Sequence, residues 1–167
     1  DISDEVIKKV IPHLDPDCPI DPATKQRWYS WVELVADGPV DSSSPESRWQ
    51  KPQVFFSHWW GGFFRDFMRI VEEVRRERRL SVNAGVWVCT FALCQFGADL
   101  GSALADSPFA RALCAADFVT LVIDRSAGSL SRTWCAFELQ LTAERGKKAH
   151  LSLYTPTGRV GSKRVSS

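Results

Sequence analysis

The sequence contains no apolar run of the roughly 18–20 residues that a bilayer-spanning helix needs. Its longest apolar stretch, residues 86–96, is interrupted by Thr90 and Gln95. It also lacks a charge excess, since 21 Lys and Arg residues face 20 Asp and Glu residues. A dedicated nucleic-acid-binding domain usually carries a strong basic excess. We therefore expect no membrane insertion and no nucleic-acid partner and, because the acidic first residues do not resemble a signal peptide, a cytoplasmic location.

Patterns typical of metal and cofactor sites are missing as well. The three histidines are scattered, and the five cysteines form no CxxC pair. Neither the Rossmann GxGxxG motif nor the P-loop motif follows the first strand-like run. An odd number of cysteines, most of them inside apolar stretches, indicates reduced and buried thiols. We therefore expect no metal centre, no disulfide framework and no bound cofactor.

The apolar content is sufficient for one core, because 44% of the 167 residues are hydrophobic and seven are Trp. Residues 1–50 differ in pattern from the rest. Apolar residues at helical spacing predict one helix that ends at Pro12 and a second over residues 22–36, and a loop rich in Gly, Pro and Ser follows. We interpret residues 1–50 as an N-terminal helical extension that packs on an α/β domain of residues 51–167.

Within that domain, apolar runs of strand length alternate with helical patterns. We predict strands over residues 54–56, 86–93, 118–123 and 149–154. The polar tail from Thr155 looks irregular. Because strands and helices alternate, we predict a three-layer, flavodoxin-like α/β sheet of about four to five mostly parallel strands.

The predicted helices have recognisable starts and buried faces. Ser107 followed by Pro108 predicts the start of one helix, with Ser as its cap. Ser131 or Thr133 is expected to cap the last helix. The helix after the first strand presents one apolar stripe. Its members are Phe63, Phe67, Ile70, Val71 and Val74.

Ligand sites in open parallel sheets form beyond the carboxyl ends of the strands. The first such loop here reads S-H-W-W-G-G, from Ser57 and His58 to Gly62. Trp59 and Trp60 offer flat stacking surfaces, the glycines permit close approach of a ligand or another loop, and a helix N-terminus that can accept a phosphate follows. This arrangement suits a nucleotide. Alternatively, the Trp pair packs on the N-terminal extension and His58 makes a structural hydrogen bond.

Glu138 is the strongest candidate for chemistry. On the predicted helix it shares a face with Trp134 and Leu141, and a carboxylate among such neighbours is costly to bury unless it is paired or functional. Partial burial would also raise its pKa. We expect it to look into the crevice between residues 57–62 and 124–129. The alternative is a salt bridge to an arginine, and Cys135 is interpreted as a core thiol. The arginines considered are Arg65, Arg111, Arg125 and Arg132.

Residues 52–154 resemble the TIR domain family, with the motifs in the family's order. Residues 129–139, S-L-S-R-T-W-C-A-F-E-L, are similar to its S-x-W-C-x-x-E-L segment. Residues 54–58 resemble its first-strand box, and residues 118–124 resemble its third strand. The S-H-W-W-G and W-C-x-F-E-L motifs together also resemble an uncharacterised TIR-like group of unicellular eukaryotes. The H-W-W sequence departs from the family pattern, and the family's last strand and helix have no clear counterpart after the fourth strand.

The resemblance implies an activity and a set of site residues. Enzymatic TIR domains cleave NAD at the nicotinamide–ribose bond, and their catalytic glutamate maps onto Glu138. NAD is then the substrate rather than a bound cofactor, and self-association completes the site. The alternatives are a non-catalytic TIR-like interaction module and an unrelated nucleotide-binding or hydrolase role. The residues expected to bind substrate are Ser57, His58, Trp59, Trp60, Gly61, Arg125, Ser129 and Trp134.

Overall fold

The computed structural model describes residues 7, 9, 30–32, 51–95, 104–146 and 150–161. Most of the predicted N-terminal extension therefore lies outside the described residues, as do Cys18 and the last six residues. Within the extension, Ile7 and Ser30 are buried. The predicted loop at residues 94–97 is described only as far as Gln95.

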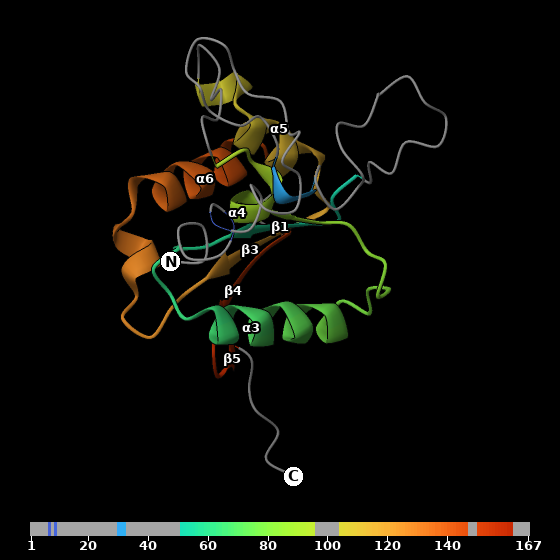
Figure 1. Ribbon diagram of the computed structural model, residues 1–167, viewed down its shortest axis with the longest axis vertical. Coiled ribbons are helices and arrows are strands. Elements are labelled where there is room, and N and C mark those ends of the chain that lie inside the picture. The colour runs from blue at the N-terminus through green and yellow to red at the C-terminus, as the bar shows by residue number, and fades with distance from the viewer. Residues whose placement is uncertain are drawn as a thin grey trace.

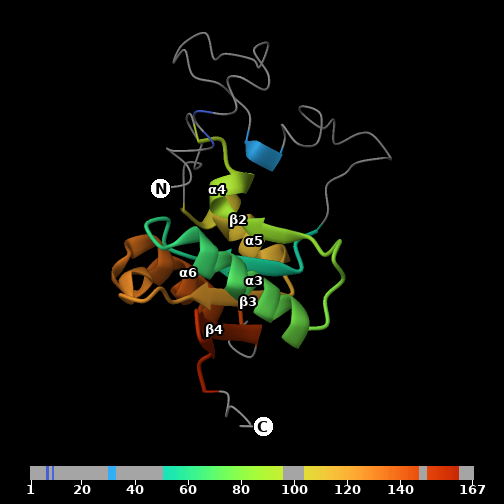
Figure 2. The same ribbon diagram turned by 60° about the horizontal axis from the view of Figure 1, so that its bottom comes forward.

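A five-stranded sheet in the order β2-β1-β3-β4-β5 forms the centre of the domain. The four larger strands pair in parallel, and β5 pairs antiparallel with β4. This strand order confirms the predicted flavodoxin-like α/β fold. Figure 2 shows β2 toward one side of the sheet, beside α4, and β4 toward the other. The strands are β1 (Val54–Ser57), β2 (Val86–Val88), β3 (Phe118–Val122), β4 (Leu151–Thr155) and β5 (Gly158–Arg159).

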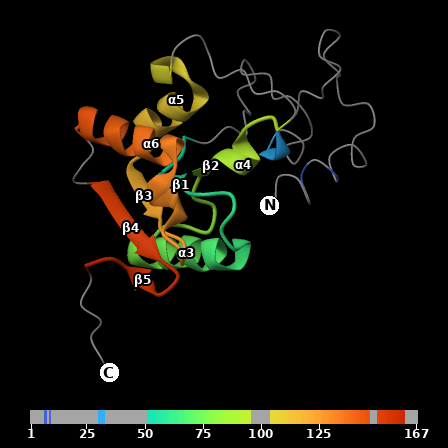
Figure 3. The same cartoon turned by 90° about the vertical axis from the view of Figure 1, so that its left-hand side faces the viewer.

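Helices cover both faces of the sheet, as a three-layer fold requires. Helix α3 (Phe64–Glu77) lies on one face, and α5 (Pro108–Ala115) and α6 (Thr133–Glu144) lie on the other (Figures 1 and 3). Each face has its own apolar cluster. The α3 side includes Val54, Phe56, Phe67, Ile70 and Val74. The side of α5 and α6 includes Phe55, Leu113, Val119 and Leu141.

Strand β1 lies between β2 and β3, and all four of its residues are buried. Successive side chains of a strand point to opposite faces of the sheet. Phe56 accordingly packs with the α3 cluster and Phe55 with the α5 and α6 cluster. The same alternation continues at the carboxyl end, where Ser57 and His58 lead toward different faces. The end of β1 thus contributes to two different environments.

The predicted strand over residues 86–93 is wrong in its second half. The strand ends at Val88, and a short helix, α4 (Cys89–Ala92), replaces the rest. An unbroken apolar run suits a strand covered on both faces, but β2 pairs only with β1 among the described strands, and Val86 is 46% exposed. Helical spacing instead buries Cys89 and Leu93 together, beside Phe109.

Helix starts were predicted with mixed success. Ser107 caps α5 by accepting a hydrogen bond from the Ala110 backbone N–H at 3.2 Å, as expected. Neither Ser131 nor Thr133 caps α6, because Arg132 occupies that position without a side-chain cap. The Ser131 hydroxyl donates instead to the Gly128 carbonyl within a preceding 3-10 turn, η3 (Gly128–Ser131).

Two further expectations need correction. Phe63 precedes α3 and is 72% exposed, so it does not belong to the buried stripe, whereas Phe67, Ile70 and Val74 do. The tail after Thr155 is not wholly irregular, because it turns back to form β5. No helix in the described part of the chain is long and apolar enough to cross a membrane.

Candidate functional site

Glu138 is held in the interior of the domain by α6. It is 4% exposed and shares the buried face of the helix with Cys135 and Leu141. Trp134, which was predicted to lie on this face, is 37% exposed and stacks on Phe109 with a ring separation of 4.9 Å. The predicted face is therefore correct for Glu138 and Leu141, with Cys135 in the place expected for Trp134.

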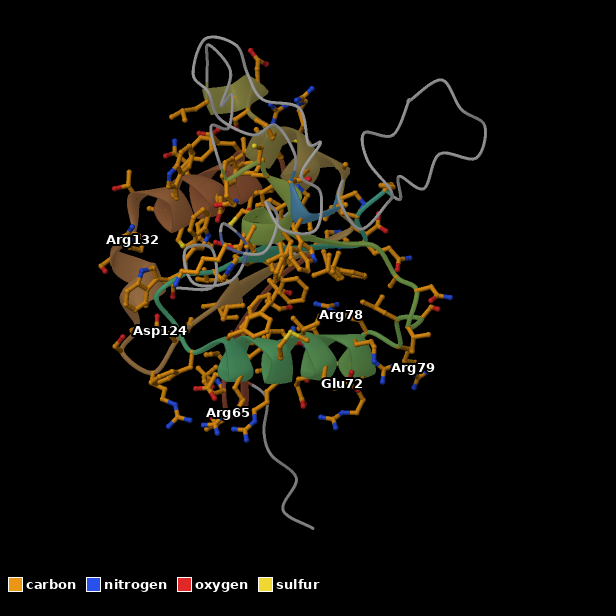
Figure 4. All side chains as sticks on the ribbon, viewed as in Figure 1. Arg65, Glu72, Arg78, Arg79, Asp124 and Arg132 are labelled. Carbon is orange, nitrogen blue, oxygen red and sulfur yellow. The ribbon has the colours of Figure 1, made fainter. Side chains whose placement is uncertain are left out.

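The Glu138 carboxylate has no cationic partner in the described part of the chain. Burial raises its pKa from 4.5 to about 7, and the nearby Ser57 hydroxyl opposes this shift. None of the ion pairs among the described residues includes Glu138. Figure 4 shows Arg65 on α3, across the sheet from α6, and Arg125 is held by Asp66. The alternative of a glutamate locked to an arginine is not what the structure shows.

Ser57 brings the end of β1 to Glu138 and Cys135. Its hydroxyl is buried and makes no hydrogen bond of good geometry with any described residue, but it lies close enough to both groups to lower their pKa values. Burial dominates for Cys135 and raises the pKa of its thiol, which agrees with a core thiol. The Thr142 hydroxyl donates to the Glu138 backbone carbonyl at 2.7 Å, and this hydrogen bond links two successive turns of α6 at Glu138.

A cavity of about 660 Å³ lies at the same end of the sheet, with walls from the β1–α3 loop, α3, α4 and the loop after β3. It gathers five of the predicted binding residues. Glu138, Ser57, Ser129 and Trp134 are not among the residues that line it. The structure thus divides the predicted site into two parts. The predicted residues that do line the cavity are His58, Trp59, Trp60, Gly61 and Arg125.

Gly61 and Gly128 make room for the Trp59 side chain, a contact that the sequence alone does not show. A Cβ atom on Gly61 would lie 2.6 Å from Trp59 Cε2, and one on Gly128 would lie 2.6 Å from Trp59 Cε3. Both distances are far below ordinary contact, so the indole lies directly against the backbone at both positions. The expected close approach is therefore that of Trp59, which joins the loops after β1 and β3.

Trp60 takes a different direction from Trp59. Its indole Nε1 donates to the Cys89 sulfur at 2.8 Å, and its ring packs on the cluster of Cys89, Leu93 and Phe109. Burial raises the pKa of the Cys89 thiol to about 12, and the hydrogen bond from Trp60 only partly opposes this. The Cys89 sulfur is thus a neutral acceptor that fixes one wall of the cavity.

His58 is a neutral, incompletely bonded histidine. Burial lowers its pKa from 6.5 to about 4, so it carries no charge near neutral pH. Its ring lies 4.7 Å from that of Phe67, and its Nδ1 atom is buried without a hydrogen-bond partner among the described residues. The Phe56 backbone lies close enough to the ring to oppose this shift in part, so the alternative that His58 makes a structural hydrogen bond stays a prediction.

The loop after β3 is organised by its own polar contacts. The Asp124 carboxylate accepts hydrogen bonds from the backbone N–H groups of Ser126 at 2.8 Å and Ser129 at 3.0 Å. Burial of Asp124 favours its protonated form, but the hydrogen bonds outweigh burial and lower its pKa. Figure 4 shows Asp124 between the start of α3 and the turn that leads to α6. Ser129 is buried by this turn, and its hydroxyl has no partner among the described residues.

Arg125 joins the same loop to α3. Its Nε donates to Asp66 Oδ2 at 2.8 Å, and this hydrogen bond lowers the pKa of the Asp66 carboxyl. Asp66 is buried, while the Arg125 side chain remains mostly exposed. Arg125 therefore holds the loop against α3 and has its guanidinium already engaged.

Sequence reasoning missed Asp66 and Thr90. Thr90 is fully buried on the cavity wall. Its hydroxyl makes no hydrogen bond of good geometry among the described residues, although it lies close enough to the Cys89 thiol to oppose the rise in that pKa. Thr90 belongs to the run that was predicted as a strand. A hydroxyl that interrupts an apolar run is nevertheless a feature of the sequence that can indicate a functional residue. No cluster of three or more potential metal ligands occurs among the described residues.

These contacts define two neighbouring environments at the carboxyl end of the sheet: a buried carboxylate beside Ser57, and an aromatic cavity. No protein-family model, characterised protein or solved structure matches the chain.

Proposed function

We propose that this chain cleaves NAD at the nicotinamide–ribose bond, with Glu138 as the catalytic carboxylate. The observation that carries the proposal is a buried carboxylate beside Ser57 without an ion-pair partner in the described structure. Burying such a group costs free energy, and carboxyl groups with strongly shifted pKa values are concentrated at functional sites. The resemblance of residues 129–139 to the enzymatic TIR segment indicates the reaction.

The reaction needs a negative charge beside the ribose. The C1′–N bond breaks, and its electron pair leaves with the nicotinamide ring, whose positive charge it neutralises. The ribose then acquires oxocarbenium character, which an adjacent carboxylate stabilises. Water adds at C1′ and releases a proton, or a ring nitrogen of the same nucleotide adds and gives a cyclic product. Ionised Glu138 supplies the stabilising charge in either case.

We propose that Trp134 helps to bind this substrate. It lies one helical turn before Glu138, and it is partly exposed beyond its contact with Phe109. In the proposed complex it stacks on a ring of NAD, while Ser57 approaches Glu138 from β1. Because Glu138 itself is almost completely buried, we propose that assembly with a second copy rearranges and completes the site.

Nicotinamide release from NAD tests this function directly. We expect the purified chain to release nicotinamide, with a specific activity that rises with protein concentration as copies assemble. Glu138→Gln keeps the shape of the side chain and removes its charge, so we expect it to lower the rate by at least about 100-fold, in the range observed when one electrostatic group is removed.

The matched control for this experiment is Glu144→Gln. Glu144 is on the same helix, and its carboxylate accepts a hydrogen bond from Gln140 on the exposed surface. It should retain the wild-type rate within about twofold, as expected for a surface change. Equal activity of Glu138→Gln and wild type would show that Glu138 is not the catalytic group.

A non-catalytic interaction module is the second candidate function. It is favoured by apolar side chains exposed at the start of α3, where Phe63 is 72% and Met68 47% exposed and Phe64 lies between them. Such adjacent exposed apolar residues mark interaction surfaces in many proteins.

We expect Phe63→Glu combined with Met68→Glu to reduce self-association by at least about tenfold, because charge at an apolar contact is costly. Light scattering across a concentration series measures the effect, with the exposed apolar position Val82→Glu as the control. Ordered assembly without nicotinamide release would favour this function over catalysis. Unchanged assembly in the double variant would exclude this surface from the contact.

A further inference from the structure

At the carboxyl ends of β1 and β2, consecutive residues pack against different parts of the domain. Ser57 lies beside Glu138, whereas the next residue, His58, packs on Phe67 of α3. Likewise Cys89 packs in the cluster with Phe109, whereas the next residue, Thr90, lies on the cavity wall. The cavity and Glu138 therefore lie at the same end of the sheet, and Glu138 does not line the cavity. Trp60 lines the cavity and donates to the Cys89 sulfur, whose pKa the Glu138 charge helps to raise.

The cavity wall is mostly aromatic and aliphatic, but it carries two unsatisfied polar atoms. These are His58 Nδ1 and Thr90 Oγ1, each buried without a hydrogen bond of good geometry among the described residues. The His58 ring lies near the Phe56 backbone, and the Thr90 hydroxyl lies near the Cys89 sulfur. Buried polar groups are nearly always paired, because leaving one unpaired costs about 1–3 kcal/mol. A ligand that reaches both atoms would recover this cost on binding. The aromatic wall residues are Trp59, Trp60, Phe63, Phe64, Phe67 and Phe91.

The charged groups on the wall are already engaged. Asp66 and Arg125 bind each other, and the Asp124 carboxylate accepts hydrogen bonds from its own loop. His58 is neutral near neutral pH because its pKa is about 4. The wall thus favours an uncharged ligand, while its aromatic rings favour a flat one. A volume of about 660 Å³ is within the usual range of small-molecule pockets.

We propose that this cavity is a ligand site separate from Glu138, and that it binds a neutral, planar heteroaromatic ring whose edge carries a hydrogen-bond donor and an acceptor. The edge pairs with His58 Nδ1 and Thr90 Oγ1, and the ring packs against the Trp and Phe side chains. This assignment does not depend on NAD cleavage. It reassigns His58, Trp60 and the rest of the wall from the substrate of Glu138 to a second ligand.

Adenine is a suitable probe, because it is uncharged and has such an edge, and indole is the comparison because it has a similar shape without that edge. We expect saturable binding of adenine by isothermal titration calorimetry and ligand-observed NMR, tighter than that of indole. Thr90→Val keeps the shape and removes the hydroxyl, so it should weaken adenine binding about threefold to tenfold, the value of one hydrogen bond. The affinity of Thr90→Val for indole should stay within about twofold of the wild-type value.

Two control variants separate this site from its surroundings. Thr142→Val removes another buried hydroxyl, one that is bonded to the backbone away from the cavity, and Glu138→Gln alters the proposed catalytic group. Both should leave adenine affinity within about twofold. His58→Phe, which retains a ring against Phe67, provides a second test of the cavity if Thr90→Val does not fold.

Two results would overturn the proposal: no saturable adenine binding up to about 10 mM, or equal adenine affinity in wild type and the cavity variants. Loss of adenine binding in Glu138→Gln would also contradict it, because the two sites would then be one. Adenine binding by a chain that releases no nicotinamide would support the cavity site while counting against the proposed catalytic function.

Discussion

Glu138→Gln is expected to stabilise the folded chain by about 3 kcal/mol above pH 7 and by almost nothing below pH 4.5, because the pKa of Glu138 rises from 4.5 to about 7 on folding. At low pH the carboxyl is protonated in both states. Between pH 4.5 and 7 the unfolded chain loses this proton while the native chain keeps it, so the free energy of unfolding falls as pH rises. Above pH 7 Glu138 is ionised in both the native and the unfolded chain, so the free-energy cost of burying its charge no longer changes with pH.

Urea denaturation of wild type and variant across pH 4–8 measures this difference. The two proteins must be compared at each pH, because His58 titrates in an overlapping range with the opposite sign: its pKa falls from 6.5 to about 4 on folding, so its contribution is lost as pH falls. The exposed control Glu144→Gln should change the free energy of unfolding by about 0.5 kcal/mol or less. If the free energies of unfolding of wild type and Glu138→Gln had the same dependence on pH, the pKa of Glu138 would not be raised by folding, which would contradict this prediction.

Gly128→Ala is expected to destabilise the fold by about 1–3 kcal/mol, the usual cost of forcing atoms into a packed site. The added Cβ would lie 2.6 Å from Trp59 Cε3 and 2.8 Å from Cζ3. The indole cannot simply move away, because its other edge lies against Gly61. Chemical denaturation measures the loss in the free energy of unfolding.

A second substitution identifies Trp59 as the cause of this loss. In a Trp59→Leu background the smaller side chain leaves room, so Gly128→Ala should cost little there. The double-mutant cycle should give a coupling energy of at least about 1 kcal/mol. Additive effects would mean that Trp59 does not pack on Gly128. The cycle tests packing alone and is independent of any ligand.

The fold could be predicted because its signals are local. The apolar runs of β1 and β3 and the apolar stripe of α3 each mark a buried segment, and their alternation defines a parallel sheet. The run over residues 86–93 could not be divided correctly, since a short apolar segment fits a strand and a buried helix equally well. Its conversion to α4 depends on the edge position of β2 and on Phe109, which packs against Cys89 and Leu93.

The candidate site was only partly predictable for a related reason. The burial of Glu138 follows from its position on α6 among apolar neighbours, which the sequence displays. The arrangement of Trp59 between Gly61 and Gly128 and the pairing of Arg125 with Asp66 join residues that are distant in sequence. Such contacts depend on how β1 and β3 are placed side by side, and a single sequence does not show them.

Among the described strands, the two at the edges of the sheet are short. Strand β2 offers three residues before the chain turns into α4, and β5 consists of two. An open edge is a template on which another polypeptide can add a strand, and long flat edges promote aggregation. Because Cys89 begins a helix instead of a fourth β residue, the backbone groups that would recruit a foreign strand are used within α4. The helix that replaces the second half of the predicted strand therefore limits the addition of further strands at this edge.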